Sequence, residues 1–182
     1  MDTDYRAQYP AVLRWLSVAI DLAMVTGGAL IILIVFGNAA FRGFGFDLAW
    51  SLEITALLML WVTFLGCAAA AARGAHMRVT EVVAILLPKT AQRYLSIVLS
   101  ILISVLLLAL IYFGTITAAH MWSETTTVLY WPIGLSYASL PVGMLFTLVF
   151  HLFNTWLDAT GHGPRDQGQL SETEEQGREG LA

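Results

Sequence analysis

The chain has little charge, a single cysteine and no basic stretch of the kind that binds nucleic acid. Only 12% of its 182 residues are charged and 58% are hydrophobic, whereas a soluble domain carries about 25% charged residues. Its one cysteine, Cys67, excludes an internal disulfide, and its place in an apolar run indicates an inert buried thiol. This composition argues against an ordinary soluble domain, and nucleic acid is not an expected partner.

Four long apolar segments predict an all-α integral membrane protein with four transmembrane helices. They run from 22 to 41, from 54 to 72, from about 94 to 119 and from about 135 to 156. At a helical rise of ~1.5 Å per residue, such lengths cross a hydrocarbon layer of roughly 30 Å. The first segment lacks the basic start and small-residue cleavage site of a secretory signal, so we expect it to be retained.

The segments around the apolar runs set the expected domain boundaries. We expect a short cytoplasmic N-terminus at 1–13, a four-helix membrane domain at 14–160 and a disordered cytoplasmic tail at 161–182, where Gly, Gln, Ser and Glu prevail. Two glycines in 42–47 predict a turn between the first two helices. Pro141 lies in the first two turns of the fourth helix and predicts a kink or a late start there.

The positions of lysine and arginine predict the orientation in the membrane. Basic residues gather at the N-terminus and in the loop between the second and third helices, whereas the first outer loop holds Arg42 alone and 121–134 holds none. By the positive-inside rule, both termini should face the cytoplasm. The residues that decide this are Arg6, Arg14, Arg73, Arg78, Lys89 and Arg93.

The loop between the second and third helices is itself patterned. Valines and leucines from Val79 to Leu87 recur at helical spacing, and Pro88 ends the pattern. This stripe is too short to span a membrane. It predicts a short amphipathic helix along the inner interface, with Arg78 and Lys89 near anionic lipid headgroups.

Glu53 is the strongest candidate for a functional side chain, because a carboxylate in a membrane helix is a functional hypothesis by default. Arg73 follows roughly 30 Å further along the helix, so Glu53 should lie near the outer surface if Arg73 marks the inner one. There it can pair with Arg42 or contact water. A structural or subunit-contact role is therefore preferred, and proton coupling is the alternative.

The histidines lie at different depths. His120 falls near the outer end of the third helix, His151 toward the inner end of the fourth, and His76 beyond Arg73. A haem held between helices needs two histidines at one depth, so a haem or quinone anchor is disfavoured. The sequence also holds no phosphate loop, metal cluster or Ser/His/Asp arrangement, and we expect neither an enzyme nor a cofactor in this chain.

Two sets of small residues predict helix contacts. Gly66 and Ala70 form a small-xxx-small pair that permits close approach of another helix, whose identity the sequence leaves open. Ser96, Ser100 and Ser104 share one face of the third helix. They either bond a neighbouring helix or bond back to their own carbonyls.

One group of motif residues lies on and just after the second predicted helix. An acidic residue follows a tryptophan at the start, a glycine follows an aromatic segment, and a G-x-H-x-R-V segment closes the helix. The order and spacing of these motifs carry more weight than any one of them. The residues are Trp50, Glu53, Trp61, Phe64, Gly66, Arg73, His76 and Arg78.

A second group lies before and at the start of the fourth helix. It contains the proline loop at 127–134, with Pro132, and then Tyr137 and the segment Leu-Pro-Val-Gly that holds Pro141 and Gly143. With both groups in this order, the chain resembles the small membrane subunit of TRAP transporters, the DctQ-type permeases. The resemblance extends over about 14–156.

The resemblance implies a subunit of a tripartite transporter in a bacterial inner membrane. In that family a periplasmic binding protein captures an organic anion such as a carboxylate, a large permease holds the substrate and sodium sites, and the small subunit scaffolds the large one. The implied partners are the large permease, the binding protein and membrane lipid. The first group of motif residues would then serve subunit contact. A docking loop and the start of the fourth helix would involve Arg42, Pro132, Tyr137, Pro141 and Gly143.

A different class of function stays open on the residues alone. A small ion-coupled transporter could act alone, as an oligomer, through Glu53. Such a transporter usually has broken helices and polar groups near mid-bilayer, and the sequence offers none at that depth. The scaffold is therefore the preferred hypothesis, and it leaves the identity of the solute unspecified.

Overall fold

The structure, a computed structural model, describes residue 5 and residues 9–74 and 89–160, and it is all-helical there except for turns and one isolated bridge. Four helices are long and apolar enough to cross a membrane. The prediction of a multi-span helical protein is therefore confirmed. The helices are α1 (Ala11–Gly43), α2 (Trp50–Ala72), α4 (Lys89–His120), α5 (Gly134–Tyr137) and α6 (Ser139–Ala159).

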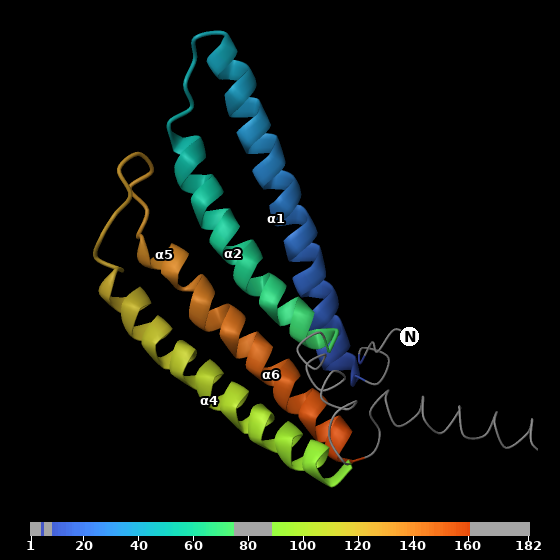
Figure 1. Cartoon of the computed structure of the whole chain (residues 1–182). Coiled ribbons are helices and arrows are strands. Elements are labelled where there is room, and N and C mark those ends of the chain that lie inside the picture. Colours follow the sequence, from blue (N-terminus) through green and yellow to red (C-terminus); the bar gives the residue numbers. More distant parts are fainter. Residues whose placement is uncertain (1–4, 6–8, 75–88, 161–182) are drawn as a thin grey trace, which may run out of the picture.

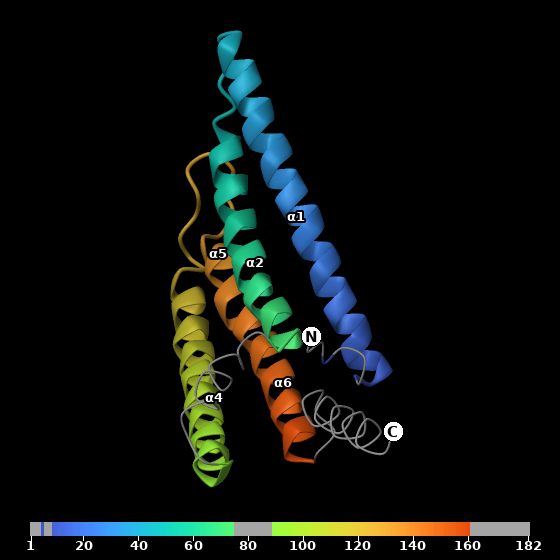
Figure 2. The same cartoon turned by 45° about the vertical axis from the view of Figure 1, so that its right-hand side comes forward.

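The long helices lie side by side with α2 and α6 at the centre. Figure 1 shows α2 between α1 and α6, with α4 on the other side of α6, and Figure 2 shows the same order from a second angle. The connections at 44–49 and 121–133 lie at one end of the molecule, which we call the Glu53 end. The opposite end, where α2 finishes, is the Arg73 end.

The first helix is longer than its apolar run. It begins at Ala11, eleven residues before the predicted start, and continues to Gly43. Pro10 precedes it with an extended backbone and gives the chain a natural helix start. The predicted turn follows: Gly45 has a φ of 83°, and the Asn38 side chain accepts a hydrogen bond from the backbone N–H of Leu48 at 3.1 Å.

The predicted disturbance at Pro141 appears as an interruption between α5 and α6. Proline has no backbone N–H to donate, so a regular hydrogen bond is lost near Ala138. The Ser139 hydroxyl donates to the carbonyl of Ser136 at 2.6 Å within this interruption. The fourth span therefore starts as one short turn and continues as a full helix.

The core has two parts. At the Arg73 end, the alanines that finish α2 pack with Ile20, Phe150 and Tyr9. Nearer the Glu53 end, Leu107 of α4 packs with Met144 and Leu148 of α6, and the partly buried Cys67 and Phe64 of α2 lie against this group.

Glycine permits the closest helix contacts, but not mainly at the predicted position. A methyl group at Gly143 would come within 2.6 Å of Phe64 Cβ and 2.7 Å of its carbonyl oxygen. A methyl group at Gly27 would come within 2.6 Å of Val62. Gly66 makes only an ordinary 3.6 Å approach to Met24. The partner of the Gly66 face is therefore α1 of the same chain, and of these three glycines only Gly143 of α6 lies against backbone atoms of α2.

Several predictions fall on residues outside the described part of the chain. They are the amphipathic helix from Val79 to Leu87, the disordered tail at 161–182 and the placement of His76 and Arg78. The orientation of the termini also stays a prediction.

Candidate functional site

Glu53 lies in the first turn of α2 and binds the loop at 121–133. Its carboxylate accepts backbone N–H bonds from Val128 at 2.8 Å and Leu129 at 2.9 Å, and a hydroxyl bond from Thr127 at 3.0 Å. Hydrogen bonds to an ionised acceptor are among the stronger ones in proteins. Arg42 and water were the two predicted partners of Glu53, and within the described residues no ion pair joins Arg42 to it. The carboxylate therefore organises a loop that lies about 75 residues away in the sequence.

The loop bound by Glu53 is a compact hairpin. The backbone N–H of Thr126 donates to the carbonyl of Trp131 at 2.8 Å, and the Trp131 N–H donates back to the Thr126 hydroxyl at 3.1 Å. Pro132 pairs with Thr125 in an isolated antiparallel bridge. Tyr130, which is 75% exposed, has a φ of 55°, a left-handed conformation that non-glycine residues rarely adopt. These contacts hold the hairpin in one shape against the start of α2.

Trp61 makes a second link between α2 and the segment after the hairpin. Its indole N–H donates to the carbonyl of Leu135 in α5 at 3.2 Å. Trp50 is the first residue of α2 and is 38% exposed, so it offers a surface instead of a core contact. Two of the three predicted contact residues in this half of α2, Glu53 and Trp61, thus act within the chain.

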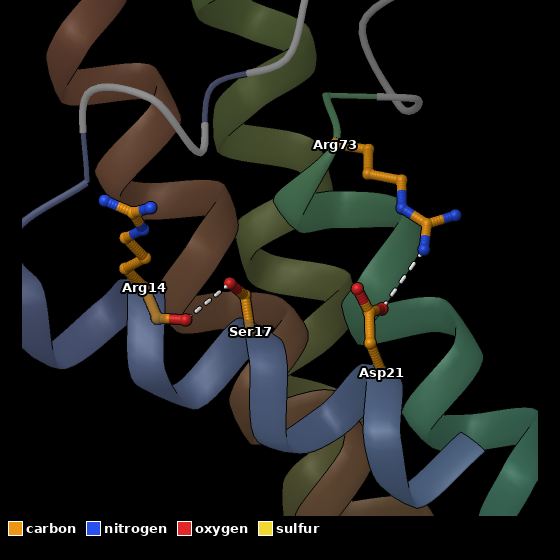
Figure 3. Close-up of polar contacts among 4 residues, drawn as sticks. All are labelled: Arg14, Ser17, Asp21 and Arg73. Carbon is orange, nitrogen blue, oxygen red and sulfur yellow. Dashed lines mark hydrogen bonds and ion pairs between the residues drawn. The ribbon is translucent and has the colours of Figure 1, made fainter. Parts of the chain in front are cut away.

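Arg73 ends α2 and bonds to α1. One nitrogen of its guanidinium lies 3.1 Å from a carboxylate oxygen of Asp21, and the two side chains are 55% and 27% exposed. Figure 3 shows Arg73 reaching across to Asp21, while the Ser17 hydroxyl turns to the carbonyl of Arg14 on its own helix. Asp21, an acidic residue within the first span, thus has the arginine of the motif as a partner.

A buried polar cluster lies beside that ion pair. The amide of Asn154, which is 3% exposed, donates to the carbonyl of Ala71 at 2.8 Å and accepts from the Tyr9 hydroxyl at 2.6 Å. The same hydroxyl lies 3.1 Å from the carbonyl of Ala72. The Tyr9 ring stacks on Phe150 with centroids 5.8 Å apart. The carbonyl of Ala71 at the end of α2 is thus satisfied by a side chain of α6, and that side chain is held in turn by Tyr9.

The α4–α6 contact carries its own polar group. The Ser100 hydroxyl lies 3.2 Å from His151 Nε2 and 2.9 Å from the Thr155 hydroxyl, whereas Ser104 bonds back to the carbonyl of Ser100. Both predicted uses of the serines therefore occur, one at Ser100 and the other at Ser104, while the side chain of Ser96 lies outside the described part of the structure. His151 is 6% exposed and lies far along the bundle from His120, the last residue of α4. No group of three or more metal-ligating side chains occurs among the described residues.

Of the remaining predicted residues, some pack against other helices and some are exposed. Gly143 and Pro141 pack against Phe64 and Gly114 respectively. Tyr137 ends α5 and is 43% exposed, and Arg42 lies in the last turn of α1 with its carbonyl accepting the N–H of Gly45. The structure thus gathers Glu53, Trp61 and Pro132 at one end, while Arg73 lies at the other and His76 and Arg78 are not described.

Sequence reasoning missed the partners that complete these contacts. The missed residues are Tyr9, Asn154, Gly27 and Gly114, and for the loop at 127–134 the contact with Glu53 was missed. A signal did exist for Asn154, because an amide in an apolar helix needs a partner. No local signal marks a backbone N–H that bonds to a distant carboxylate.

Comparisons of the sequence with known proteins identify its family. The family described as "Tripartite ATP-independent periplasmic transporters, DctQ component" matches residues 31–161. The ectoine TRAP transporter small permease protein TeaB of Halomonas elongata is 29% identical over 111 residues. That match covers 60% of this chain and 57% of the relative, so the chain spans less than two thirds of the relative's length.

The family match includes three of the four spans in full, the Glu53 hairpin and most of the motif residues. It covers well over half of the chain. The resemblance drawn from Trp50, Glu53 and the Pro141–Gly143 segment is therefore confirmed at the level of the family. This multi-pass membrane protein belongs to the DctQ family, the small permease component of the tripartite ATP-independent periplasmic transporters.

Proposed function

We propose that this chain is the small scaffold subunit of a sodium-driven TRAP transporter that imports an organic anion such as a carboxylate. The observation that carries the proposal is the use of Glu53. Its carboxylate holds the hairpin at 121–133 through three donors. A carboxylate that couples ion movement needs to exchange its partners, whereas this one fixes a loop.

The other polar groups of the spans support the same role. Asn154 and His151 are both buried, and each bonds within the chain, to Ala71 and Tyr9 and to Ser100 respectively. Groups that bond to one another in this way stabilise helix contacts. A rigid framework of this kind suits a subunit that holds a moving partner in place.

The proposed partners are a large permease and a periplasmic binding protein, with membrane lipid around the spans. Sodium ions would bind in the large subunit, and this chain would hold no cofactor. The exposed hairpin with Tyr130 and the turn after Arg42 would then face the periplasm, with 1–13 and 161–182 in the cytoplasm of a bacterial cell. The distribution of Arg14, Arg73 and the other basic residues supports this orientation. We also place the predicted amphipathic helix at 79–87 along the inner interface.

Co-purification and reconstitution test the proposal. A tagged chain, co-expressed with the large permease of its system, should retain that permease through detergent extraction. In vesicles with an inward sodium gradient and the binding protein present, the complex should take up solute, and the chain alone should not. Ectoine is the first solute to test, because the relative from Halomonas elongata is named for it. Uptake by the chain alone would contradict the scaffold role.

A substitution separates the scaffold from a stand-alone transporter acting through Glu53. Glu53→Gln keeps the size of the side chain and removes its charge. In a scaffold, uptake per assembled complex should persist, and any loss should follow a loss of assembly. Glu124→Gln, in the same hairpin but outside the Glu53 contact, is the matched control. Abolished uptake by a fully assembled Glu53→Gln complex would show that Glu53 takes part in transport and would contradict a purely structural role.

A further inference from the structure

A groove of about 670 Å³ opens between α4 and α6 near the Glu53 end. One wall consists of α4 residues between Ile111 and Ala119, with Trp122 just after the helix, and the other of residues between Ala138 and Leu145. Both walls belong to helices that are long and apolar enough to span a membrane. The groove is separate from the Glu53 contact, the Arg73 ion pair and the Ser100–His151 group.

Small residues next to close helix contacts create the groove. Gly114 lets α4 touch Leu140 and Pro141, and Gly134 lies against the carbonyl of Ala118 and the ring of Trp122. Beside these contacts the walls carry alanines, so no large side chain fills the angle between the helices. Those alanines are Ala118, Ala119 and Ala138.

The lining is chemically uniform. Apart from the Trp122 indole, the only polar side chain in it is Thr115, whose hydroxyl already donates to the carbonyl of Ile111 at 2.7 Å. No charged side chain lines the groove. A solute with a carboxylate or an ammonium group would lose its hydration there without gaining a partner. The lining therefore selects an apolar occupant.

The length of the groove further restricts which apolar molecule can occupy it. Along α4 the wall runs from Ile111 to Ala119, which is about 12 Å at ~1.5 Å per residue, and Trp122 lies in the turn just beyond the helix. The groove therefore fits within one leaflet, which is about half of the roughly 30 Å hydrocarbon layer. Trp122, 54% exposed, stands at the outer end, where tryptophan favours the membrane–water interface. Deeper in the bundle, Leu107, Met144 and Leu148 close the two helices on each other.

We propose that this groove binds one acyl chain of a membrane phospholipid, with the headgroup beside Trp122. A partner helix would need a groove that continues along α4 and α6, and this one ends where Leu107 meets Met144. The bound chain would complete the packing of α4 against α6 at the Glu53 end. The inference rests on the membrane spans and not on the proposed partners, so either can fail without the other.

Native mass spectrometry of the full chain tests this site. The purified protein is delipidated, incubated with palmitoyl-oleoyl phosphatidylethanolamine in detergent and weighed with its bound lipid. Ala119→Phe places a ring in the groove from an exposed position on α4. Thr117→Phe places the same ring at the same depth on the opposite face of α4. We expect one retained phospholipid for the unchanged chain and for Thr117→Phe, and about a tenfold weaker binding for Ala119→Phe.

A second variant controls for the possibility that Ala119→Phe loses lipid through misfolding. Leu145→Trp fills the groove from α6 at a position that is 48% exposed, and it should reduce lipid retention in the same way. Equal retention by Ala119→Phe, Leu145→Trp and the unchanged chain would overturn the proposal. So would unchanged lipid retention combined with loss of the co-purified permease, because the groove would then be a protein contact.

Discussion

The two ends of the molecule hold their helices in different ways. At the Glu53 end, one carboxylate accepts hydrogen bonds from the backbone of a loop. At the Arg73 end, side chains bond across helices: Arg73 to Asp21, and Tyr9 to Asn154. The first arrangement fixes the shape of a connection between spans. The second fixes the distances between the spans themselves.

This difference bears on function. A hairpin that keeps one shape, including the left-handed Tyr130, presents the same surface to any partner that meets it. An end built from cross-helix bonds keeps α1, α2 and α6 together as one body. Both properties suit a scaffold subunit, and the contrast predicts that the two ends can be loosened separately, except where they share a helix contact.

The shared contact is Gly143 against Phe64, and breaking it should have the largest effect. In Gly143→Ala, the added methyl would meet Phe64 backbone atoms at 2.7 to 2.8 Å, so α2 and α6 must separate. We expect a loss of about 1–3 kcal/mol in unfolding free energy. Reversible SDS unfolding in mixed micelles measures it, and hydrogen exchange should rise at both ends.

Gly28→Ala is the control for this change. A methyl at Gly28 meets nothing within 4 Å, and alanine is the better helix former. It should leave stability unchanged or raise it by about 0.5–1 kcal/mol. Equal losses for the two alanine variants would show that helix propensity, and not the close α2–α6 approach, sets the effect.

Asn154→Leu should loosen the Arg73 end alone. It keeps a similar volume but removes the bonds to Ala71 and Tyr9, leaving a buried carbonyl and hydroxyl with fewer partners. Leaving a buried polar group without its hydrogen-bond partner lowers the unfolding free energy by about 1–3 kcal/mol. Hydrogen exchange should rise at 9–20 and stay unchanged at 125–133. Leu152→Ala, on the exposed side of α6, should change stability by no more than about 0.5 kcal/mol.

Glu53→Gln should loosen the Glu53 end alone. The amide offers one acceptor oxygen in place of two and carries no charge, so the bonds from Val128 and Leu129 weaken. Amide exchange at these two residues should speed up severalfold, with 9–20 unaffected. Glu124→Gln should leave both amides as protected as in the unchanged chain. Uniform loosening of both ends would remove the distinction between them.

Much of the fold follows from the sequence, because it depends on long apolar runs. Spans need ~20 apolar residues whatever their neighbours, and the four runs, the turn at Gly45 and the break near Pro141 all appear in the structure. The start of α1 was wrong by eleven residues, since Arg14 and Asp21 interrupt the apolar run without interrupting the helix. The hydropathy pattern gives the length of the apolar part of a helix, and the helix itself can extend beyond that part.

Partners of single side chains are harder to predict. Glu53 and Arg73 are conspicuous as charges in an apolar chain, yet each bonds to something the sequence does not mark. The Glu53 partners are backbone N–H groups, and Asp21 lies 52 residues from Arg73. Pairing over such distances is set by how α1, α2 and α6 pack, which depends on glycines whose neighbours are known only in three dimensions.

The smallest effect concerns the Asp21–Arg73 pair, and it also tests the depth assigned to Arg73. Exposed ion pairs contribute about 0.2–1 kcal/mol, and salt screens them over about 10 Å at 0.1 M. The double-mutant cycle of Asp21→Asn and Arg73→Gln should therefore give a small coupling energy that shrinks as salt is added. A pair held in hydrocarbon would behave differently, because removing one partner would leave an uncompensated charge at about 3–5 kcal/mol, insensitive to salt. Glu53 lies about 30 Å along α2 from Arg73, which is roughly the thickness of the hydrocarbon layer. A salt-sensitive ion pair would therefore place Arg73 at one membrane surface and Glu53 at the other. A salt-insensitive ion pair would place Arg73 inside the bilayer and Glu53 well outside the opposite surface.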